Sequence, residues 1–308
     1  MNQKETIAST EGNLQSKLQE HFNEEISTLT LKGSGLCNDA YYLETKDGKK
    51  YLVKLEKEIQ EFEPENSLVV EAEVAKELYS ANLNVPIPKV VFISNNPDMY
   101  GYEYIEGDML KNTLGSLSEE ERISIFKQLG IFHAQIGQNV SKETAEKIGV
   151  TVDESTDSHP ETLQEYASII EDETLPEEFT VLVKKAKSLL DSTTNESVFQ
   201  FIHNDAHHEN IIIKDNQISG IIDFGNSEYG ETAKEFSRYI RDFPDYFEHI
   251  VSSYEETSGN KLSRKRLISN ACVSGFIDIV ENYKSTGERK IKAESMIRTY
   301  QRLLKDFT

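Results

Sequence analysis

The stretch Phe201–Gly225, FIHNDAHHENIIIKDNQISGIIDFG, decides how the rest of the chain can be organised. Two short apolar runs, Ile211–Ile213 and Ile218–Ile222, are joined by an Asp-Asn turn, which predicts a β-hairpin. A polar loop, residues 203–210, precedes this hairpin, and an Asp-Phe-Gly follows it. We therefore expect the functional side chains at the open end of the hairpin, on the loop and just after the second strand.

Four polar residues of this stretch have a recognisable spacing. His203, Asp205 and Asn210 form H-x-D-x-x-x-x-N, and Asp223 begins the D-F-G. Protein kinases have the same two motifs in their catalytic loop and magnesium site. Asp205 is therefore the candidate catalytic base or acceptor-orienting carboxylate. Asn210 and Asp223 are candidate Mg²⁺ ligands, because hard oxygen ligands suit this ion. We expect His203 to support the loop through a ring hydrogen bond.

Phosphoryl transfer also needs a positive charge on the phosphates. Lys54 lies in the predicted strand 51–55 as Tyr-Leu-Val-Lys, which resembles the V-A-I-K of kinases. Glu71, in the next predicted helix, is its favoured ion partner, and Glu73 is the rival. Two positions along a helix turn by about 200°, so only one of the two carboxylates can face Lys54.

The first half of the chain has mainly strand-like patterns. An amphipathic helix is predicted over 12–26, because apolar residues recur there every fourth position. An Asp-Gly pair favours a hairpin between the second and third strands. Gly33-Ser34-Gly35 lies between the first two strands, where Ser34 and Gly35 would cover nucleotide phosphates; an ordinary hairpin loop is the alternative. The predicted strands are 28–31, 40–43, 51–55, 90–93 and 100–105, with one helix over 66–82.

The second half is mostly helical. Ser118 to Glu121 form a capping box that opens a long helix. Residues 139–162 are polar and acidic, and we expect them to be exposed with little core. Further helices are predicted over 164–170, 177–190, 231–242, 244–257, 263–283 and 288–306. The sequence therefore predicts an α+β fold of two lobes: a β-rich N-terminal lobe, 1–106, that holds nucleotide, and a mostly helical C-terminal lobe, 107–308, with the catalytic loop and acceptor site.

Composition excludes several other classes of protein. The formal net charge is −21, with 33 basic and 54 acidic residues, so nucleic acid is a poor partner. Cys37 and Cys272 are far apart and no Cys or His cluster surrounds His207 and His208, which makes a disulfide scaffold or zinc site a poor interpretation. No apolar run is long enough to span a membrane, and the N-terminus does not resemble a signal peptide. We expect a cytoplasmic protein.

Over residues 29–236 the chain resembles the aminoglycoside phosphotransferase and choline kinase-like family. His203 to Asn210 are similar to the family motif H-G-D-x-H-x-x-N, and Gly220 to Gly225 resemble G-x-I-D-[FW]-G. The H-N-D form and the segment 86–92 look most like aminoglycoside 2″-phosphotransferases. After the D-F-G, Asn226, Glu231 and Glu235 stand where the family often has aspartates, and we expect them to support the loop.

The resemblance implies a bilobal kinase-like fold that binds ATP or GTP with Mg²⁺ between its lobes. The base would lie against the link Glu103-Tyr104-Ile105, so that Glu103 and Ile105 contact nucleotide. Lys54 would bind the α- and β-phosphates, Asp205 would be catalytic, and Asn210 and Asp223 would hold Mg²⁺.

The same resemblance implies transfer of the γ-phosphate to a hydroxyl group of a small molecule, with an aminoglycoside-type antibiotic as the favoured acceptor. A metabolite kinase of the homoserine, methylthioribose or choline type is the alternative, and a non-catalytic nucleotide-binding protein is a further one. Acidic residues of the C-terminal helices suggest a cationic acceptor, although they could equally form a solvated surface: Asp242, Asp245, Glu248, Glu255, Asp278 and Glu281.

Overall fold

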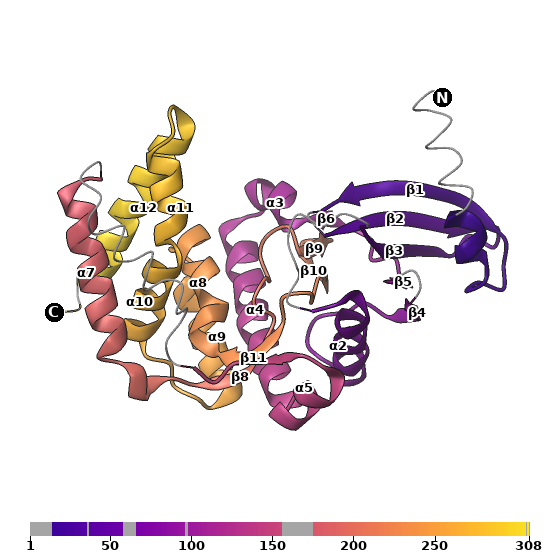
Figure 1. The fold of residues 1–308 in the computed structure, drawn as a ribbon, viewed down its shortest axis with the longest axis horizontal. Helices are drawn as coiled ribbons and strands as arrows, with labels where there is room; N and C mark the ends of the chain where they lie inside the picture. Colours follow the sequence, from indigo (N-terminus) through magenta and orange to yellow (C-terminus); the bar gives the residue numbers. More distant parts are fainter. Residues whose placement is uncertain are drawn as a thin grey trace.

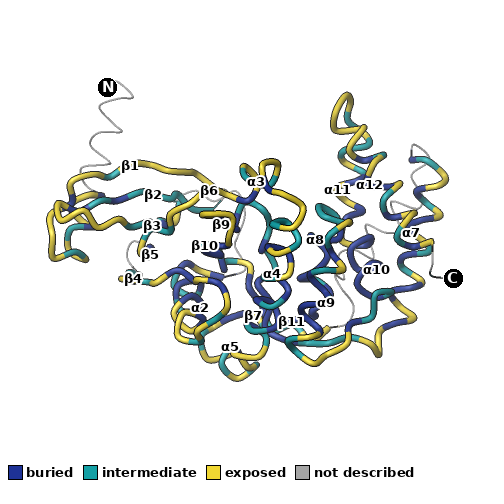
Figure 2. Tube along the Cα trace, turned by 180° about the vertical axis from the view of Figure 1, so that it is seen from behind, coloured by how far each residue is buried: buried dark blue, intermediate teal, exposed yellow. Residues whose placement is uncertain are grey.

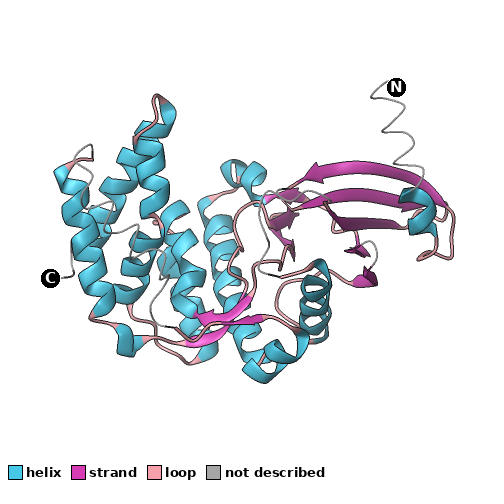
Figure 3. Cartoon of the chain, viewed as in Figure 1, coloured by secondary structure: helices cyan, strands magenta, loops and turns pink. Residues whose placement is uncertain are grey.

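The computed structural model describes residues 14–35, 37–57, 66–95, 98–155, 175–305 and 307. The chain leads from a strand-rich half at one end of the molecule to a helical half at the other (Figure 1). Figure 3 shows the same division by secondary structure. The α+β class predicted from the sequence is confirmed.

The N-terminal half is built on one antiparallel sheet with the strand order β1-β2-β3-β5-β4. Its strands are β1 Ile26–Ser34, β2 Asn38–Thr45, β3 Lys50–Glu56, β4 Val90–Asn95 and β5 Asp98–Glu103. The hairpin expected between β2 and β3 is present. Gly48 has φ +83° there, and its N–H donates to the Thr45 carbonyl at 2.9 Å. Glycine adopts this conformation without the steric cost that a side chain would bring.

Helix α2, Leu68–Ser80, lies between β3 and β4 in the chain and packs on β4 and β5. The Ser67 hydroxyl caps it by accepting from the Val70 N–H at 3.3 Å. Glu71 is buried on this helix among apolar residues, with 1% of its surface exposed. A buried carboxylate needs a partner, so its position on α2 already points toward an ion pair.

The predicted helix over 12–26 is too long at its C-terminal end. In the described part of this segment, residues 14–19 are helical and Ile26 already begins β1. The Gln19 side chain stabilises the reversal between them, because its Oε1 accepts from the Ile26 N–H at 2.9 Å and its Nε2 donates to the Glu24 carbonyl at 2.9 Å. Ile26 is buried in the small core under the sheet, which is why it continued the apolar pattern of the helix.

Two small sheets frame the connection to the C-terminal half. One has the order β10-β9-β6 and the other β7-β11-β8, in which β7 and β11 are parallel. Their strands are β6 Asp108–Met109, β7 Thr151–Val152, β8 Phe199–Ile202, β9 Ile211–Lys214, β10 Gln217–Ile221 and β11 Glu228–Glu231. The predicted hairpin of the opening stretch is therefore β9–β10.

Helices make up most of the remaining chain, and they enclose the largest apolar core. They are α3 Leu110–Thr113, η1 Leu114–Ser116, α4 Glu119–Asn139, α5 Lys142–Ile148, α7 Glu177–Asp191, η2 Thr194–Glu196, α8 Thr232–Asp242, α9 Phe247–Ser258, α10 Arg264–Ser274, α11 Phe276–Tyr283 and α12 Glu288–Leu304. Figure 2 shows buried segments concentrated in α4, α9 and α10, whereas β1 is largely exposed. The capping box of Ser118 and Glu121 is present at the start of α4.

Two predictions in this half need correction. Residues 263–283 form two helices, because the chain breaks at Gly275, where a Cβ would lie 2.6 Å from the Tyr300 hydroxyl. Residues 139–155 are not only surface, since α5 lies there and Ala145 and Val150 are buried. The helix predicted over 164–170 lies outside the described residues. The division of the chain into lobes 1–106 and 107–308 stays a prediction, although the five-stranded sheet ends at Glu103.

Candidate active site

The hairpin β9–β10 brings the two ends of the opening stretch together. Ile211 pairs with Ile221, and the Ile222 N–H donates to the Asn210 carbonyl at 3.0 Å. Asn210 therefore lies beside the residue that precedes Asp223. Asp223 has φ +70°. Asp adopts this left-handed conformation more readily than most residues, because its short polar side chain can form local hydrogen bonds.

Asp205 is held from two sides. The Arg238 Nη1 donates to its Oδ1 at 2.6 Å, and the Asn210 Nδ2 donates to its carbonyl oxygen at 2.9 Å and to its Oδ2 at 3.3 Å. Burial raises the pKa of Asp205, and the Arg238 guanidinium offsets part of that rise. Asp205 is thus a mostly buried carboxylate with a fixed orientation. Arg238, on α8, was not predicted from the sequence.

Glu235 of α8 holds the start of the loop through hydrogen bonds. Its Oε2 accepts from the His203 N–H at 2.5 Å and from the Asn204 N–H at 3.1 Å. The expected ring hydrogen bonds of His203 are also present: Nδ1 accepts from the Asp205 N–H at 3.2 Å, and Nε2 donates to the Ile222 carbonyl at 3.1 Å. Glu235 therefore supports the loop, as its position after the D-F-G led us to expect. Glu231 pairs with the buried Arg266.

Lys54 on β3 joins the sheet to the loop. Its Nζ donates to both carboxylate oxygens of Glu71 at 2.8 Å and to Asp223 Oδ1 at 2.8 Å. Glu71 also accepts from the Tyr100 hydroxyl at 2.8 Å, whereas the rival Glu73 is half-exposed and pairs with Lys76. The Glu71 side of the helix therefore faces Lys54.

Opposite charges in this cluster support each other electrostatically. Burial alone would lower the pKa of Lys54, but the carboxylates of Asp223 and Glu71 raise it above its ordinary value. The Lys54 charge in turn lowers the pKa of Asp223, against the effect of burial. Lys54 is therefore cationic and Asp223 anionic at neutral pH.

Asn66, just before α2, ties the sheet half to the D-F-G segment. Its Nδ2 donates to the Gly225 carbonyl at 3.0 Å and to the Ser227 carbonyl at 2.8 Å, and its N–H donates to the Gly225 carbonyl at 3.1 Å. These three contacts hold α2 against the segment that carries Asp223. Sequence reasoning missed Asn66, because no local pattern distinguishes it from any other residue before a helix.

A cavity of about 230 Å³ lies between the sheet and the hairpin and is lined at the end of the hairpin by Ile222, the residue before Asp223. Apolar side chains from both halves line it: Leu52, Tyr102, Ile105, Met109, Ile212 and Ile222. Ile105 thus lines the cavity, whereas Glu103 does not and pairs with Lys89 at 2.6 Å. Lys32, Asp108 and Asn112 add polar groups to the lining. An apolar cavity with a few polar groups is typical of a small-molecule site.

Ser34 and Gly35 lie at the end of β1. The Ser34 hydroxyl donates to Asp39 Oδ1 at 2.6 Å, and the Gly35 N–H donates to the Asn38 carbonyl at 2.9 Å. Lys57 Nζ donates to the Gly35 carbonyl. Among the described residues, no contact joins Ser34 or Gly35 to the Lys54 cluster. Their role in phosphate binding stays a prediction.

The donor set fits Mg²⁺. Asp223 is half-exposed, and within the described residues its Oδ2 has no hydrogen bond. Asn210 uses its Nδ2 on Asp205, which leaves its Oδ1 to face a ligand. A carboxylate and an amide oxygen are suitable for an ion that keeps several waters and binds phosphates as well. No group of three or more His, Cys, Asp or Glu that could hold a metal is found in the described part of the chain.

A second cavity, of about 530 Å³, lies between α3, the end of α8 and α12. We call it the α8–α12 cavity. His208 lines it, and the Lys111 N–H donates to the His208 carbonyl at 2.9 Å, which joins this cavity to the loop. Its full lining is Lys111, Leu114, His208, Arg241, Asp242, Phe243, Pro244, Lys292, Ser295, Met296, Thr299 and Tyr300.

The acidic residues expected to attract a cation are mostly paired with arginine. Asp242 and Asp278 both contact Arg241 at 2.9 Å, Asp245 contacts Arg302 at 3.4 Å, and Arg264 binds Glu248 at 3.0 Å and Glu255 at 2.7 Å. Of the six, only Asp242 lines the α8–α12 cavity. Five of the six carboxylates are therefore paired with arginine, and Glu281 is exposed on α11; whether they meet a cationic acceptor stays a prediction.

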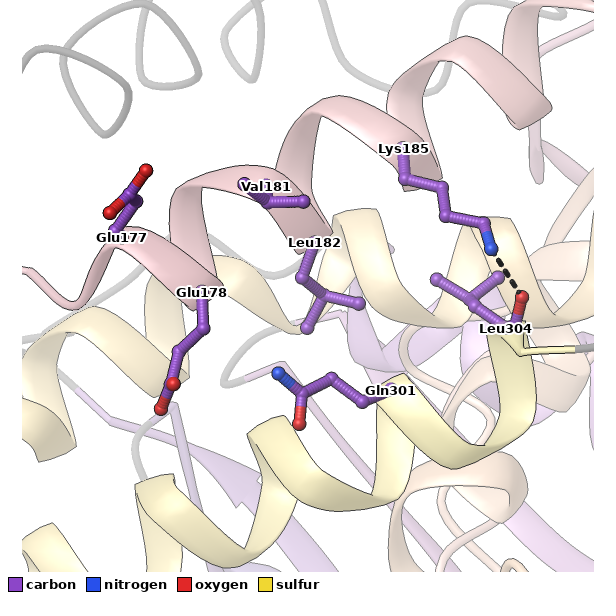
Figure 4. Close-up of a pocket in the computed structure, with 7 residues that line it drawn as sticks. All are labelled: Glu177, Glu178, Val181, Leu182, Lys185, Gln301 and Leu304. Carbon is purple, nitrogen blue, oxygen red and sulfur yellow. Dashed lines mark hydrogen bonds between the residues drawn. The ribbon is translucent and has the colours of Figure 1, made fainter. Parts of the chain in front are cut away.

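A third hollow, of about 510 Å³, lies between α7 and α12. In Figure 4, Leu182 and Lys185 of α7 face Gln301 and Leu304 of α12, and Lys185 Nζ donates to the Leu304 carbonyl at 2.8 Å. Val181 beside them is exposed. No residue of the catalytic loop lines this hollow, so it is separate from the site described above.

The fold agrees with that of known proteins. Residues 28–265 match the family model described as the phosphotransferase enzyme family, and the chain belongs to this family. The predicted enzyme class, a phosphotransferase that acts on an alcohol group, is thereby confirmed. A search of curated protein sequences gave no match.

Solved structures share the whole fold at low sequence identity. The streptomycin–ATP complex of APH(2")-IIa has 18% identity, covers 94% of this chain and 97% of its own, and gives a TM-score of 0.61. The GDP and kanamycin complex of APH(2")-IIia has 16% identity, 96% and 99% coverage, and a TM-score of 0.65. The macrolide 2'-phosphotransferase MphH from Brachybacterium faecium has 17% identity, 94% and 97% coverage, and a TM-score of 0.64. The predicted kinase-like fold is confirmed.

Among the described residues, no helix has the length and apolar character needed to cross a membrane.

Proposed function

We propose that this phosphotransferase is a Mg²⁺-dependent small-molecule kinase that transfers the γ-phosphate of ATP or GTP to a hydroxyl group. The observation that carries the proposal is the contact of Lys54 with both Glu71 and Asp223 at 2.8 Å, beside the loop that presents Asp205. Kinases need these charges together in one place, because catalysis of phosphoryl transfer depends on positioning and charge stabilisation.

Each residue has a defined role in this reaction. The base would occupy the apolar cavity that Ile105 and Ile222 line, and Ile222 directly precedes Asp223 in the chain. Lys54 would then donate to the phosphates, and Asp223 and Asn210 would hold Mg²⁺. When bound, the ion neutralises charge on the β- and γ-phosphate oxygens. Asp205 would accept a hydrogen bond from the acceptor hydroxyl and take up its proton.

The environment of Asp205 suits a base of this kind. Burial raises its pKa, which strengthens it as a proton acceptor, and Arg238 keeps the carboxylate ionised and oriented. The complete set of Lys54, Asp205, Asn210 and Asp223 argues against a protein that binds nucleotide without transfer.

Two classes of acceptor follow from different observations. An aminoglycoside-type antibiotic is supported by the H-N-D motif and by similar structures that contain streptomycin or kanamycin. A metabolite kinase is supported by the pairing of the acidic helices with arginine, since a polycation would find few free carboxylates there. We propose that the acceptor lies in the α8–α12 cavity in either case.

Nucleotide turnover with Mg²⁺ tests the proposed function. ATP and GTP would be supplied with a panel of aminoglycosides, macrolides and hydroxylated metabolites, and phosphorylated product would be detected by mass spectrometry. We expect at least one acceptor to yield a product with the wild type and none with Asp205→Ala. Turnover that survives Asp205→Ala would exclude the mechanism.

A further inference from the structure

Asp223 has a backbone conformation that its neighbours must hold in place. Its φ of +70° lies in the left-handed region, which costs a non-glycine residue free energy and persists only where surrounding contacts fix it. Lys54 holds one carboxylate oxygen, Oδ1, at 2.8 Å. The direction in which the other oxygen, Oδ2, faces a metal ion therefore depends on what fixes the main chain on each side of Asp223.

The main chain before Asp223 is fixed by the C-terminal half. The Ile222 N–H donates to the Asn210 carbonyl at 3.0 Å, and the Ile222 carbonyl accepts from His203 Nε2 at 3.1 Å. Both partners belong to the catalytic loop. These contacts therefore set the position of Asp223 relative to that loop.

The main chain after Asp223 is fixed by the N-terminal half, through Asn66. Its Nδ2 donates to the carbonyls of Gly225 at 3.0 Å and Ser227 at 2.8 Å, and its N–H donates to the Gly225 carbonyl at 3.1 Å. Asn66 is buried, with 5% of its surface exposed. Water is thus a poor substitute for these bonds, and a carbonyl that lost its donor would stay unsatisfied.

The start of helix α2 contacts the same segment a second time. Asn66 lies two residues before α2, and Glu71 in its first turn binds Lys54 at 2.8 Å. A Cβ on Gly225 would lie 3.7 Å from Glu71 Oε2, which is van der Waals contact. A shift of α2 would therefore move both Asn66 and the carboxylate that holds Lys54, and with them the two groups that fix Asp223.

On the basis of the proposed function, we propose that Asn66 is a positioning residue for the metal ligand Asp223. It transmits the position of α2 to the D-F-G segment, so that Asp223 Oδ2 and Asn210 Oδ1 face one Mg²⁺ ion when α2 rests on this segment. Asn66 acts through the Gly225 and Ser227 carbonyls and is not itself a catalytic residue. Replacing residues that orient a metal ligand typically changes metal affinity or activity by roughly 10–100-fold.

Asn66→Ala tests this role, because it removes both Nδ2 bonds and keeps the N–H bond to Gly225. Calorimetry would measure the binding of a non-hydrolysable ATP analogue once with Mg²⁺ and once with EDTA. By linkage, the ratio of the two dissociation constants equals the factor by which the protein changes the affinity of the analogue for Mg²⁺. We expect the dissociation constant with Mg²⁺ to rise about tenfold and the one with EDTA to stay within about twofold of the wild type.

Asn84→Ala is the matched control, because Asn84 follows α2 and joins the two halves by the same kinds of bond. Its N–H donates to Gln135 Oε1 at 2.7 Å and its Nδ2 to the Gln128 carbonyl at 3.0 Å, both on α4. Among the described residues, no hydrogen bond joins Asn84 to the D-F-G segment. We expect both of its dissociation constants to equal those of the wild type.

Asn66→Ser keeps one short donor and extends the test to a milder change. Its dissociation constant with Mg²⁺ should lie between those of the wild type and Asn66→Ala. An equal loss of affinity with Mg²⁺ and with EDTA, an unchanged Mg²⁺ value in Asn66→Ala, or the same Mg²⁺-specific loss in Asn84→Ala would each overturn the inference. Failure of both Asn66 variants to fold would overturn it as well, because Asn66 would then be a residue of general stability.

Hydrogen exchange in the nucleotide-free protein separates this inference from the proposed function. Residues 223–228 should exchange faster in Asn66→Ala than in the wild type, with α4 unchanged, and equal exchange of this segment would overturn the inference. Failure of the kinase proposal would instead appear as a wild type that does not bind the analogue, or as nucleotide turnover that does not depend on Asp205. The exchange result decides the role of Asn66 in either case.

Discussion

Lys54 compensates two carboxylates, and one of them, Glu71, is fully enclosed. The Lys54→Met variant would leave Glu71 buried and charged with no cation beside it. We expect this variant to lose about 3 kcal/mol of unfolding free energy, the usual result of breaking a buried pair. Its turnover should fall at least about 100-fold, because a donor to the phosphates is removed. Urea unfolding and steady-state kinetics measure the two effects.

The double variant Lys54→Met/Glu71→Leu is the control for this prediction. It removes the uncompensated charge, so we expect it to recover at least half of the lost stability although Tyr100 loses its acceptor. Turnover should stay as low as in Lys54→Met. A double variant no more stable than the single one would show that burial of Glu71 is not the cause.

Arg238 lowers the pKa of Asp205, the candidate base. Burial raises the pKa of Asp205, and Arg238 holds that rise in check. Arg238→Gln removes the cation, so the pKa of Asp205 should move further up and the acid limb of the kcat–pH profile should move to higher pH. We expect the variant to lose several-fold more activity at pH 5 than at pH 8. Parallel pH profiles for variant and wild type would contradict this role.

Helix α8 holds the catalytic loop through a carboxyl group that titrates near neutral pH. Burial raises the pKa of Glu235 from 4.5 to about 7. The folded state therefore binds a proton more tightly than the unfolded state, so Glu235 favours folding most below pH 4.5, and this contribution disappears as the pH rises to about 7. Glu235→Gln keeps an oxygen for the His203 and Asn204 N–H groups but cannot titrate.

We expect the unfolding free energy of the wild type, relative to Glu235→Gln, to fall by about 2–3 kcal/mol between pH 5 and pH 8. His133, whose Nδ1 lies 3.6 Å from Glu235, does not reverse this trend, because burial lowers its pKa and keeps it neutral. Denaturant unfolding at several pH values measures the difference. If the unfolding free energies of the wild type and Glu235→Gln change equally between pH 5 and pH 8, the pKa of Glu235 lies outside this pH range.

At the level of elements, sequence periodicity predicted which helices and strands form but not where some of the helices end. The five strands of the sheet, α2 and the β9–β10 hairpin follow from alternating residues, an Asp-Gly turn and capping residues that are local in sequence. At Gly275, where α10 ends, Tyr300 of another helix leaves no room for a side chain, and the Gln19 side chain accepts from the Ile26 N–H beyond the first helix. Such tertiary contacts leave no mark in a local pattern.

At the scale of the whole molecule, the site residues that lie in one local motif could be predicted, and those that come from distant elements could not. Asp205, Asn210 and Asp223 could be predicted, because their spacing lies within one loop and hairpin. Arg238 and Asn66 could not, since they reach the site from elements far apart in sequence and have no motif of their own. The charge of the acceptor stays a prediction for a related reason: composition counts carboxylates but does not show which of them face arginine.

How the two halves meet depends on the link that begins after β5. Gly107 in this link has φ +139°, and a Cβ there would lie 2.5 Å from the Ile213 carbonyl oxygen. Gly107→Ala should therefore cost at least about 2 kcal/mol of stability, from backbone strain and from the clash with β9. Gly107 also lines the apolar cavity beside Ile105, so the KM for nucleotide should rise together with the loss of stability.

Gly115→Ala is the matched control, because Gly115 has open space around it and an ordinary backbone conformation. Its melting temperature and its KM for ATP should equal those of the wild type. If Gly107→Ala lowered the melting temperature by several degrees without any change in the KM for ATP, the link would hold the two halves together without shaping the cavity. A fall in melting temperature together with a rise in the KM for ATP is expected only if the nucleotide slot is formed by the contact of the two halves.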